Sequence, residues 1–164
     1  MGRMGKSIYL SWSGRSDIMD HLVCLDSEAK ELERLTKGIK SMIVHGAAER
    51  KPPHGQVGEG DTLYFVLDSE DGLVRAKARV KNATSSPMLN QEASIIRLIQ
   101  NQRKLMLTEQ QVRRWGGRRY MVFVEVEQIE HLEPFCIDRS VLSGKDGWAV
   151  VGDIAKVRKH PPSN

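Results

Sequence analysis

The sequence contains little cysteine, few aromatic residues and no long apolar run. Its two cysteines, Cys24 and Cys136, lie far apart in a chain of 164 residues, and neither belongs to a Cys-x-x-Cys pair. This pattern predicts two buried, reduced thiols and excludes a disulfide framework. No apolar stretch approaches the roughly 20 residues that a membrane-spanning helix needs, so no membrane partner is expected.

Signals for export, metals and cofactors are also missing. The first residues, MGRMGKSIYLSW, lack the apolar segment of a signal peptide, and with the free thiols this predicts a cytoplasmic protein. The five histidines show no metal-ligand spacing. No phosphate-binding loop or nucleophile elbow is present. We therefore expect no metal and no cofactor.

The hydrophobic content of 40% is enough for an ordinary core. We predict a single domain over residues 1–164, with residues 160–164 as a frayed tail. The net charge is +4, a mild excess that favours polyanionic partners. Seven cations and one acid lie between Arg97 and Arg119, whereas five acids and no Lys or Arg lie between Glu125 and Asp138. This segregation predicts a basic side and an acidic side.

Short strands interrupted by helices at unequal intervals predict an α+β fold rather than a regular βαβ series. The expected architecture is a small, mixed, mostly antiparallel β-barrel with peripheral helices. Residues 18–25 allow either a helix or an irregular segment. The strands are expected at residues 7–12, 40–45, 61–68, 73–83, 119–127, 135–137 and 148–151.

Three helices are expected between these strands. The first is capped by Asp26 or Ser27 and ends before Gly38, which suits a left-handed position after a helix. The second spans residues 90–105, with Ile95, Ile96 and Ile99 on its inner face. The third, at residues 108–115, begins with the capping-box pattern Thr108-x-x-Gln111.

Two basic clusters are candidates for phosphate contact. Residues 73–83 alternate between apolar and basic side chains, so a strand there has one wholly cationic face. Such a face either follows a phosphate backbone or is simply solvated. The second cluster surrounds Trp115, which is available to stack on a base, although these residues also suit a helix end that packs on the barrel. The basic residues of the two clusters are Arg75, Lys77, Arg79, Lys81, Arg113, Arg114, Arg118 and Arg119.

The segment of residues 38–65, GIKSMIVHGAAERKPPHGQVGEGDTLYF, resembles the ASCH branch of the PUA-like superfamily. The ASCH signature is G-x-K-x-x-E-x-R. Gly38 and Lys40 match it, whereas Ile43 and His45 stand where Glu and Arg are expected. The resemblance implies a small closed β-barrel with a cleft beside the Lys40 strand, and a role in RNA binding or coactivation.

The leading hypothesis is a module that binds RNA or a modified nucleotide. Lys40, Ser41, Arg50 and Lys51 would join the basic clusters in contacting phosphate, and Trp12 or Trp115 would stack on a base. Some ASCH-like proteins hydrolyse acylated nucleosides with a lysine, a hydroxyl and a carboxylate. The rival hypothesis is therefore a small amidohydrolase with Lys40 as catalytic base or nucleophile and a carboxylate from Glu49, Asp61 or Glu125. A third is a protein-interaction adaptor that uses residues 125–138.

Overall fold

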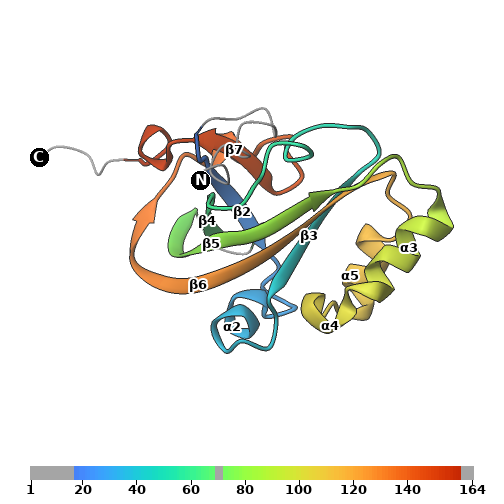
Figure 1. Cartoon of the computed structure of the whole chain (residues 1–164). Coiled ribbons are helices and arrows are strands. Elements are labelled where there is room, and N and C mark those ends of the chain that lie inside the picture. Colours follow the sequence, from blue (N-terminus) through green and yellow to red (C-terminus); the bar gives the residue numbers. More distant parts are fainter. Residues whose placement is uncertain (1–16, 69–71, 160–164) are drawn as a thin grey trace, which may run out of the picture.

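The computed structural model describes residues 17–68 and 72–159. These residues form an α+β fold in which one six-stranded sheet curls around a core, with the order β3-β6-β5-β4-β2-β7 (Figure 1). The β2–β4 pair is parallel and the other four pairs are antiparallel. The mixed, mostly antiparallel arrangement predicted from the sequence is thus confirmed. The strands are β2 (Asp20–Leu25), β3 (Met42–Ala47), β4 (Thr62–Leu67), β5 (Leu73–Ser85), β6 (Tyr120–Cys136) and β7 (Trp148–Gly152).

The helices are short and lie outside the sheet. Figure 1 shows α3 (Gln91–Gln100), α4 (Gln102–Leu105) and α5 (Glu109–Trp115) gathered at one end of the molecule, while α2 (Glu31–Thr36) lies apart from them. Among the described residues, the 3-10 turns are η2 (Arg139–Leu142) and η3 (Ile154–Lys156).

The sheet is an open, curled half-barrel rather than the closed barrel that we predicted. Within the described residues, β3 and β7 each pair with one strand only and form the two edges. Long strands twist strongly, and β5 and β6 curve together along the sheet (Figure 1). The curl brings the two edges toward each other without pairing them, so that the rings of His45 on β3 and Trp148 on β7 lie 6.1 Å apart between their centroids.

The alternating strand is confirmed and builds the main core. The apolar residues Val74, Ala76, Ala78 and Val80 are at most 1% exposed. Ala76, Ala78 and Val80 pack with side chains of β2, β3, β4 and β6 and with Trp148. Because side chains alternate along a strand, the basic residues between them point to the other face.

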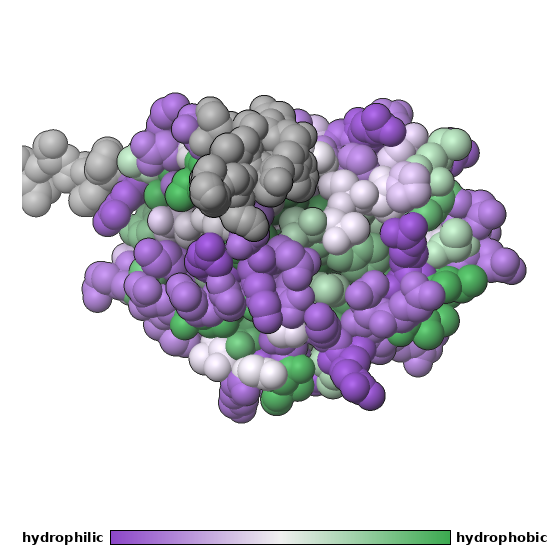
Figure 2. Space-filling model, viewed as in Figure 1, coloured by the Kyte–Doolittle hydropathy of each residue, from purple (hydrophilic) through white to green (hydrophobic). Residues whose placement is uncertain are grey.

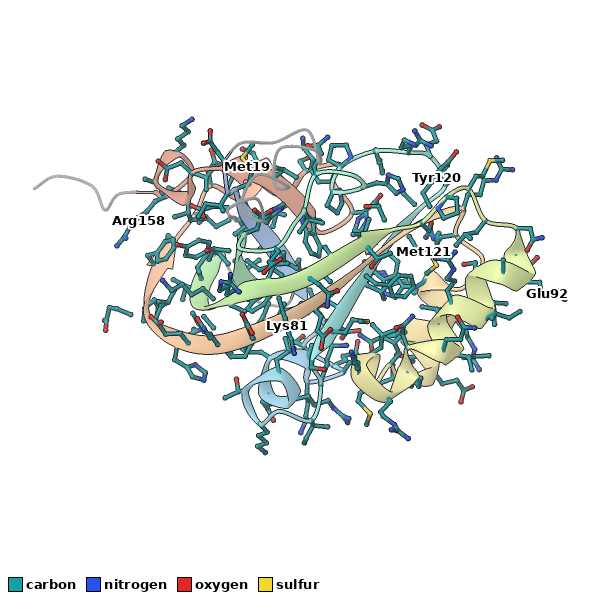
Figure 3. The ribbon with its side chains drawn as sticks, viewed as in Figure 1. Met19, Lys81, Glu92, Tyr120, Met121 and Arg158 are labelled. Carbon is teal, nitrogen blue, oxygen red and sulfur yellow. The ribbon has the colours of Figure 1, made fainter. Side chains whose placement is uncertain are left out.

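A second apolar cluster joins the helices to β3 and β6. Leu98, Leu105 and Leu107 pack there against Met121, which Figure 3 shows at the start of β6 beside the helices. The predicted inner face of residues 90–105 is wrong for two of its three isoleucines. Ile96 and Ile99 are 45% and 67% exposed and Ile95 is half-buried, whereas Ser94 and Leu98 are the buried residues of α3.

Local signals at the helix ends give mixed outcomes. The Thr108 capping box is present, with both reciprocal hydrogen bonds, and Gly38 follows α2 with φ of +77°. The predicted cap at Asp26 or Ser27 is wrong, because α2 starts after Lys30, which has no side-chain cap. Asp26 instead accepts a hydrogen bond from the backbone of Ala29.

The predictions for residues 18–25 and for the two cysteines differ from the structure. Residues 20–25 form a strand, which neither alternative for 18–25 anticipated. Both cysteines are free thiols, but Cys24 is half-buried and Cys136 exposed, so the prediction of two buried thiols is wrong. The expected strand at 7–12, Trp12 and the tail at 160–164 lie outside the described residues. No helix in the described ranges is long and apolar enough to cross a membrane.

Candidate functional site

A cleft of about 220 Å³ lies where the two edges of the curled sheet approach each other. Its walls come from β2 and β3, from the end of α5, and from the residues that lead into β7. The volume is below the roughly 300–1,000 Å³ of typical small-molecule pockets. The cleft therefore suits a single planar ring better than a whole nucleotide.

His45 of β3 is the unusual polar group of this cleft. The residue is 3% exposed, and its buried Nε2 atom has no hydrogen-bond partner in the part of the chain that the structure describes. Buried polar atoms nearly always find a partner, so an unsatisfied one often marks a place where a ligand or a water binds. His45 stands at the position where the ASCH signature has Arg. The departure from the signature therefore places an imidazole in the cleft.

Two tryptophans flank His45. The centroid of the His45 ring lies 5.6 Å from that of Trp115 and 6.1 Å from that of Trp148. Trp115 comes from the end of α5 and approaches β3 closely at Gly46. A Cβ added at Gly46 would stand 3.2 Å from the Trp115 ring and 2.8 Å from Cγ of Arg118. Gly46 therefore allows the end of α5 to reach the cleft.

Cations from two distant segments meet around His45. Lys51, from the loop after β3, forms a 2.7 Å ion pair with Asp146 of the cleft wall. Arg114 lies over the Trp115 ring, 4.7 Å from its centroid. Burial lowers the pKa of His45, the positive charges of Lys51, Arg114 and Arg118 add to this shift, and Asp146 opposes it. One basic loop and one basic helix end, both predicted from the sequence, thus share this region.

The other residues predicted to contact phosphate in the basic loop and at the basic helix end lie at the margins of the cleft. Arg50 is placed over the ring of Tyr120, 5.5 Å from its centroid, and Arg113 pairs with Glu109 on the same helix. Arg119 is exposed at the start of β6. Ser41 pairs through its backbone with β6 and α4, outside the residues that line the cleft.

Lys40 is buried rather than presented to the cleft. It is 1% exposed, its ammonium lies 3.2 Å from a carboxylate oxygen of Glu31, and it donates to the carbonyl of Leu105. Burial lowers the pKa of Lys40, and Glu31 opposes that shift. Glu31 itself lines the cleft, so Lys40 acts on the cleft only through its partner.

The carboxylate beside Lys40 is none of the three proposed from the sequence. Glu49 is exposed, Asp61 pairs with His21, and Glu125 lies 3.2 Å from Lys104. Glu31 was missed because it precedes Lys40 on a separate helix, where acids are common for local reasons.

A fully buried polar relay supports the second tryptophan. The indole of Trp148 donates to Nδ1 of His21 at 3.1 Å, so the proton of the neutral ring sits on Nε2. That Nε2 lies 2.8 Å from the Asp61 carboxylate. Asp61 also accepts hydrogen bonds from the backbone of Met19 and Gly58. The relay holds Trp148 in one orientation beside the cleft.

The cations of β5 lie on the sheet face turned away from the main core, and they meet acids there. Arg79 pairs with Glu127 of β6, and Lys81 lies 3.9 Å from Glu125. Figure 2 shows hydrophilic side chains over β5 and β6, and Figure 3 shows Lys81 there. The predicted separation of a basic side (residues 97–119) from an acidic side (residues 125–138) is incomplete, because Glu125 lies 3.2 Å from Lys104 and Glu127 pairs with Arg79.

The curled sheet and its outer helices are similar in fold to solved ASCH structures, in line with the resemblance predicted from residues 38–65. ASCH from Zymomonas mobilis is similar in structure, with a TM-score of 0.58 and 12% sequence identity, over 87% of this chain and 98% of that chain. Two mutant forms of the same protein match with TM-scores of 0.58 and 0.57. No family model and no curated protein sequence matches the chain. At this identity the likeness shows the fold.

The buried His45 makes a prediction about acid stability. Burial, with help from the nearby cations, lowers its pKa from 6.5 to about 4. Between these values the unfolded chain takes up a proton that the folded chain does not, so stability falls as the pH falls through this window. From pH 7 to pH 5, the wild type is expected to lose about 2 kcal/mol more than His45→Phe.

Urea unfolding at the two pH values measures this difference. His131→Phe is the matched control, since His131 is exposed, and it should keep the wild-type pH dependence. Equal pH dependence in the wild type and His45→Phe would contradict a depressed His45 pKa.

Proposed function

We propose that this domain binds single-stranded RNA or a nucleotide, with a base in the His45 cleft and phosphates on the cations around it. The observation that carries the proposal is the cleft itself. It combines two tryptophans, an unsatisfied buried imidazole and nearby cations from two segments. Unpaired bases are recognised by stacking on aromatic and arginine planes and by hydrogen bonds to their edges.

Arg114 and Arg118 are assigned the phosphate contacts, because both are exposed beside the cleft. Lys51 is shared with Asp146, and a ligand phosphate would compete with that carboxylate. The ASCH-type fold supports this reading at the level of the domain class.

The amidohydrolase alternative has less support. A catalytic base or nucleophile must reach the substrate, whereas the Lys40 ammonium is buried between Glu31 and a backbone carbonyl. We therefore assign Lys40 a positioning role and treat binding as the function.

Titration of fluorescently labelled single-stranded RNA at low and moderate salt tests the proposal. The double variant Arg114→Ala/Arg118→Ala is expected to bind at least about tenfold more weakly. Its slope of log affinity against log salt should be smaller by about 1.4, the value for two lost contacts to a single strand.

The matched control is Arg75→Ala/Lys77→Ala, which removes the same charge from the opposite face of the sheet. It should bind nearly as the wild type does. If the control loses as much affinity as the first variant, RNA lies on the β5 face instead. Absence of wild-type binding at low salt rules out the proposed function.

A further inference from the structure

The His45 cleft has two chemical zones, and together they indicate which kind of base it accepts. Cations lie around His45, as described above, but the lining of the cleft is acidic. Among the described residues, four carboxylates line it, and Arg114 is the one cationic side chain in the lining. Phosphate would be repelled by such a lining, so the group that enters the cleft must offer hydrogen-bond donors. The four carboxylates belong to Asp26, Glu31, Asp68 and Asp146.

Three of these carboxylates keep an oxygen that a ligand can use. Asp26 Oδ1 accepts from Ala29, and Asp68 Oδ1 accepts from Ser27. Asp146 uses Oδ2 for its ion pair with Lys51. Among the described residues, the second oxygen of each has no hydrogen-bond partner. Glu31 differs, since both its oxygens are engaged, by Lys40 and by the backbone of Asp26.

We propose that the cleft is a pocket for one nucleobase that carries an exocyclic amine, with His45 as its specificity-determining residue. This rests on the proposed function and specifies its ligand. Carboxylates accept hydrogen bonds from the amino groups of bases and oppose a keto oxygen at the same place. The two tryptophans and the small volume favour one planar ring.

His45 contributes one hydrogen bond to the base edge. In either neutral tautomer its Nε2 is a donor or an acceptor, and it has no partner in the structure. A base that fills the cleft can form a hydrogen bond with this atom. An apolar ligand in the cleft leaves the atom without a partner. Unpaired buried groups are costly, so the atom selects for a base with a complementary edge.

Short oligouridine RNAs with a single changed nucleotide test the inference by the same titration. The changed position carries adenosine, inosine or an abasic site. Adenosine has an amine at C6 and an acceptor at N1, whereas inosine has a keto oxygen at C6 and an N1–H donor. The wild type is expected to bind the adenosine RNA about tenfold more tightly than the inosine RNA. His45→Phe should weaken binding of the adenosine RNA about tenfold and leave binding of the abasic RNA unchanged.

His45→Gln keeps a hydrogen-bonding side chain and should recover part of the lost affinity. Equal wild-type affinities for the adenosine and inosine RNAs overturn the inference and leave the proposed function standing. Equal weakening of the adenosine and abasic RNAs in a folded His45→Phe also overturns it. If no RNA binds to the wild type even at low salt, the proposed function fails and the inference fails with it.

Discussion

Replacement of Asp61 by alanine is expected to lower the free energy of unfolding by about 4 kcal/mol. The carboxylate is 0% exposed and accepts from the backbone of Met19, the backbone of Gly58 and the ring of His21. Alanine leaves these three donors unsatisfied in the interior. It also releases the His21 ring, which holds Trp148. Urea unfolding at neutral pH measures the loss.

Asp68→Ala is the matched control. Asp61 directly precedes strand β4, and Asp68 directly follows it but is exposed. Asp68 accepts from Ser27 at the surface, and its loss should change stability by no more than about 0.5 kcal/mol. A loss below about 1 kcal/mol for Asp61→Ala would mean that water replaces the carboxylate and that the relay is not structural.

Replacement of Glu31 by leucine is expected to destabilise the fold by about 3–5 kcal/mol. The variant leaves the Lys40 ammonium, which is 1% exposed, with the Leu105 carbonyl as its remaining contact. An unpaired buried charge costs far more than the net value of the pair it came from. Urea unfolding again supplies the measurement.

The double variant Lys40→Met/Glu31→Leu removes both charges of the buried pair and keeps side chains of similar size. Two apolar side chains of similar size often replace a buried ion pair with little loss or even a gain in stability. We expect the double variant to recover most of the stability that Glu31→Leu loses, and to bind RNA. A double variant that folds but binds no RNA would show that the pair does more than position the cleft wall.

The elements predicted best are those whose signals are local. The apolar alternation of residues 73–83, the capping box at Thr108 and the glycine at position 38 each depend on neighbours within a few residues. Boundaries and partners were predicted less well. The helix at residues 90–105 breaks at Asn101. Ile96 and Ile99 face solvent, because the packing of Leu98 on Met121 decides which face is buried.

For the candidate site too, the sequence predicted single residues but not how they come together. Lys51, Arg114 and Trp115 were recognisable as candidates, since a basic loop and an arginine-rich helix end are visible in the sequence. Their meeting at His45 was not, because it depends on how β3 and α5 pack. The acids of residues 125–138 looked set apart along the chain, yet Glu127 and Glu125 lie beside Arg79 and Lys81 of the neighbouring strand β5.

By itself the sequence predicted an ASCH-like fold and mostly antiparallel strands, and it contained the basic residues that the proposed function uses. Periodicity, caps and turn residues are short-range properties, so they can be read along the chain. Only the tertiary structure decided that the sheet is open and that a cleft lies between its edges. It alone placed Glu31 beside Lys40 and left His45 unsatisfied between two tryptophans. These features join residues far apart, such as His21 and Trp148, which are 127 positions apart. Contacts over such distances follow from the curl of the whole sheet and from packing against it.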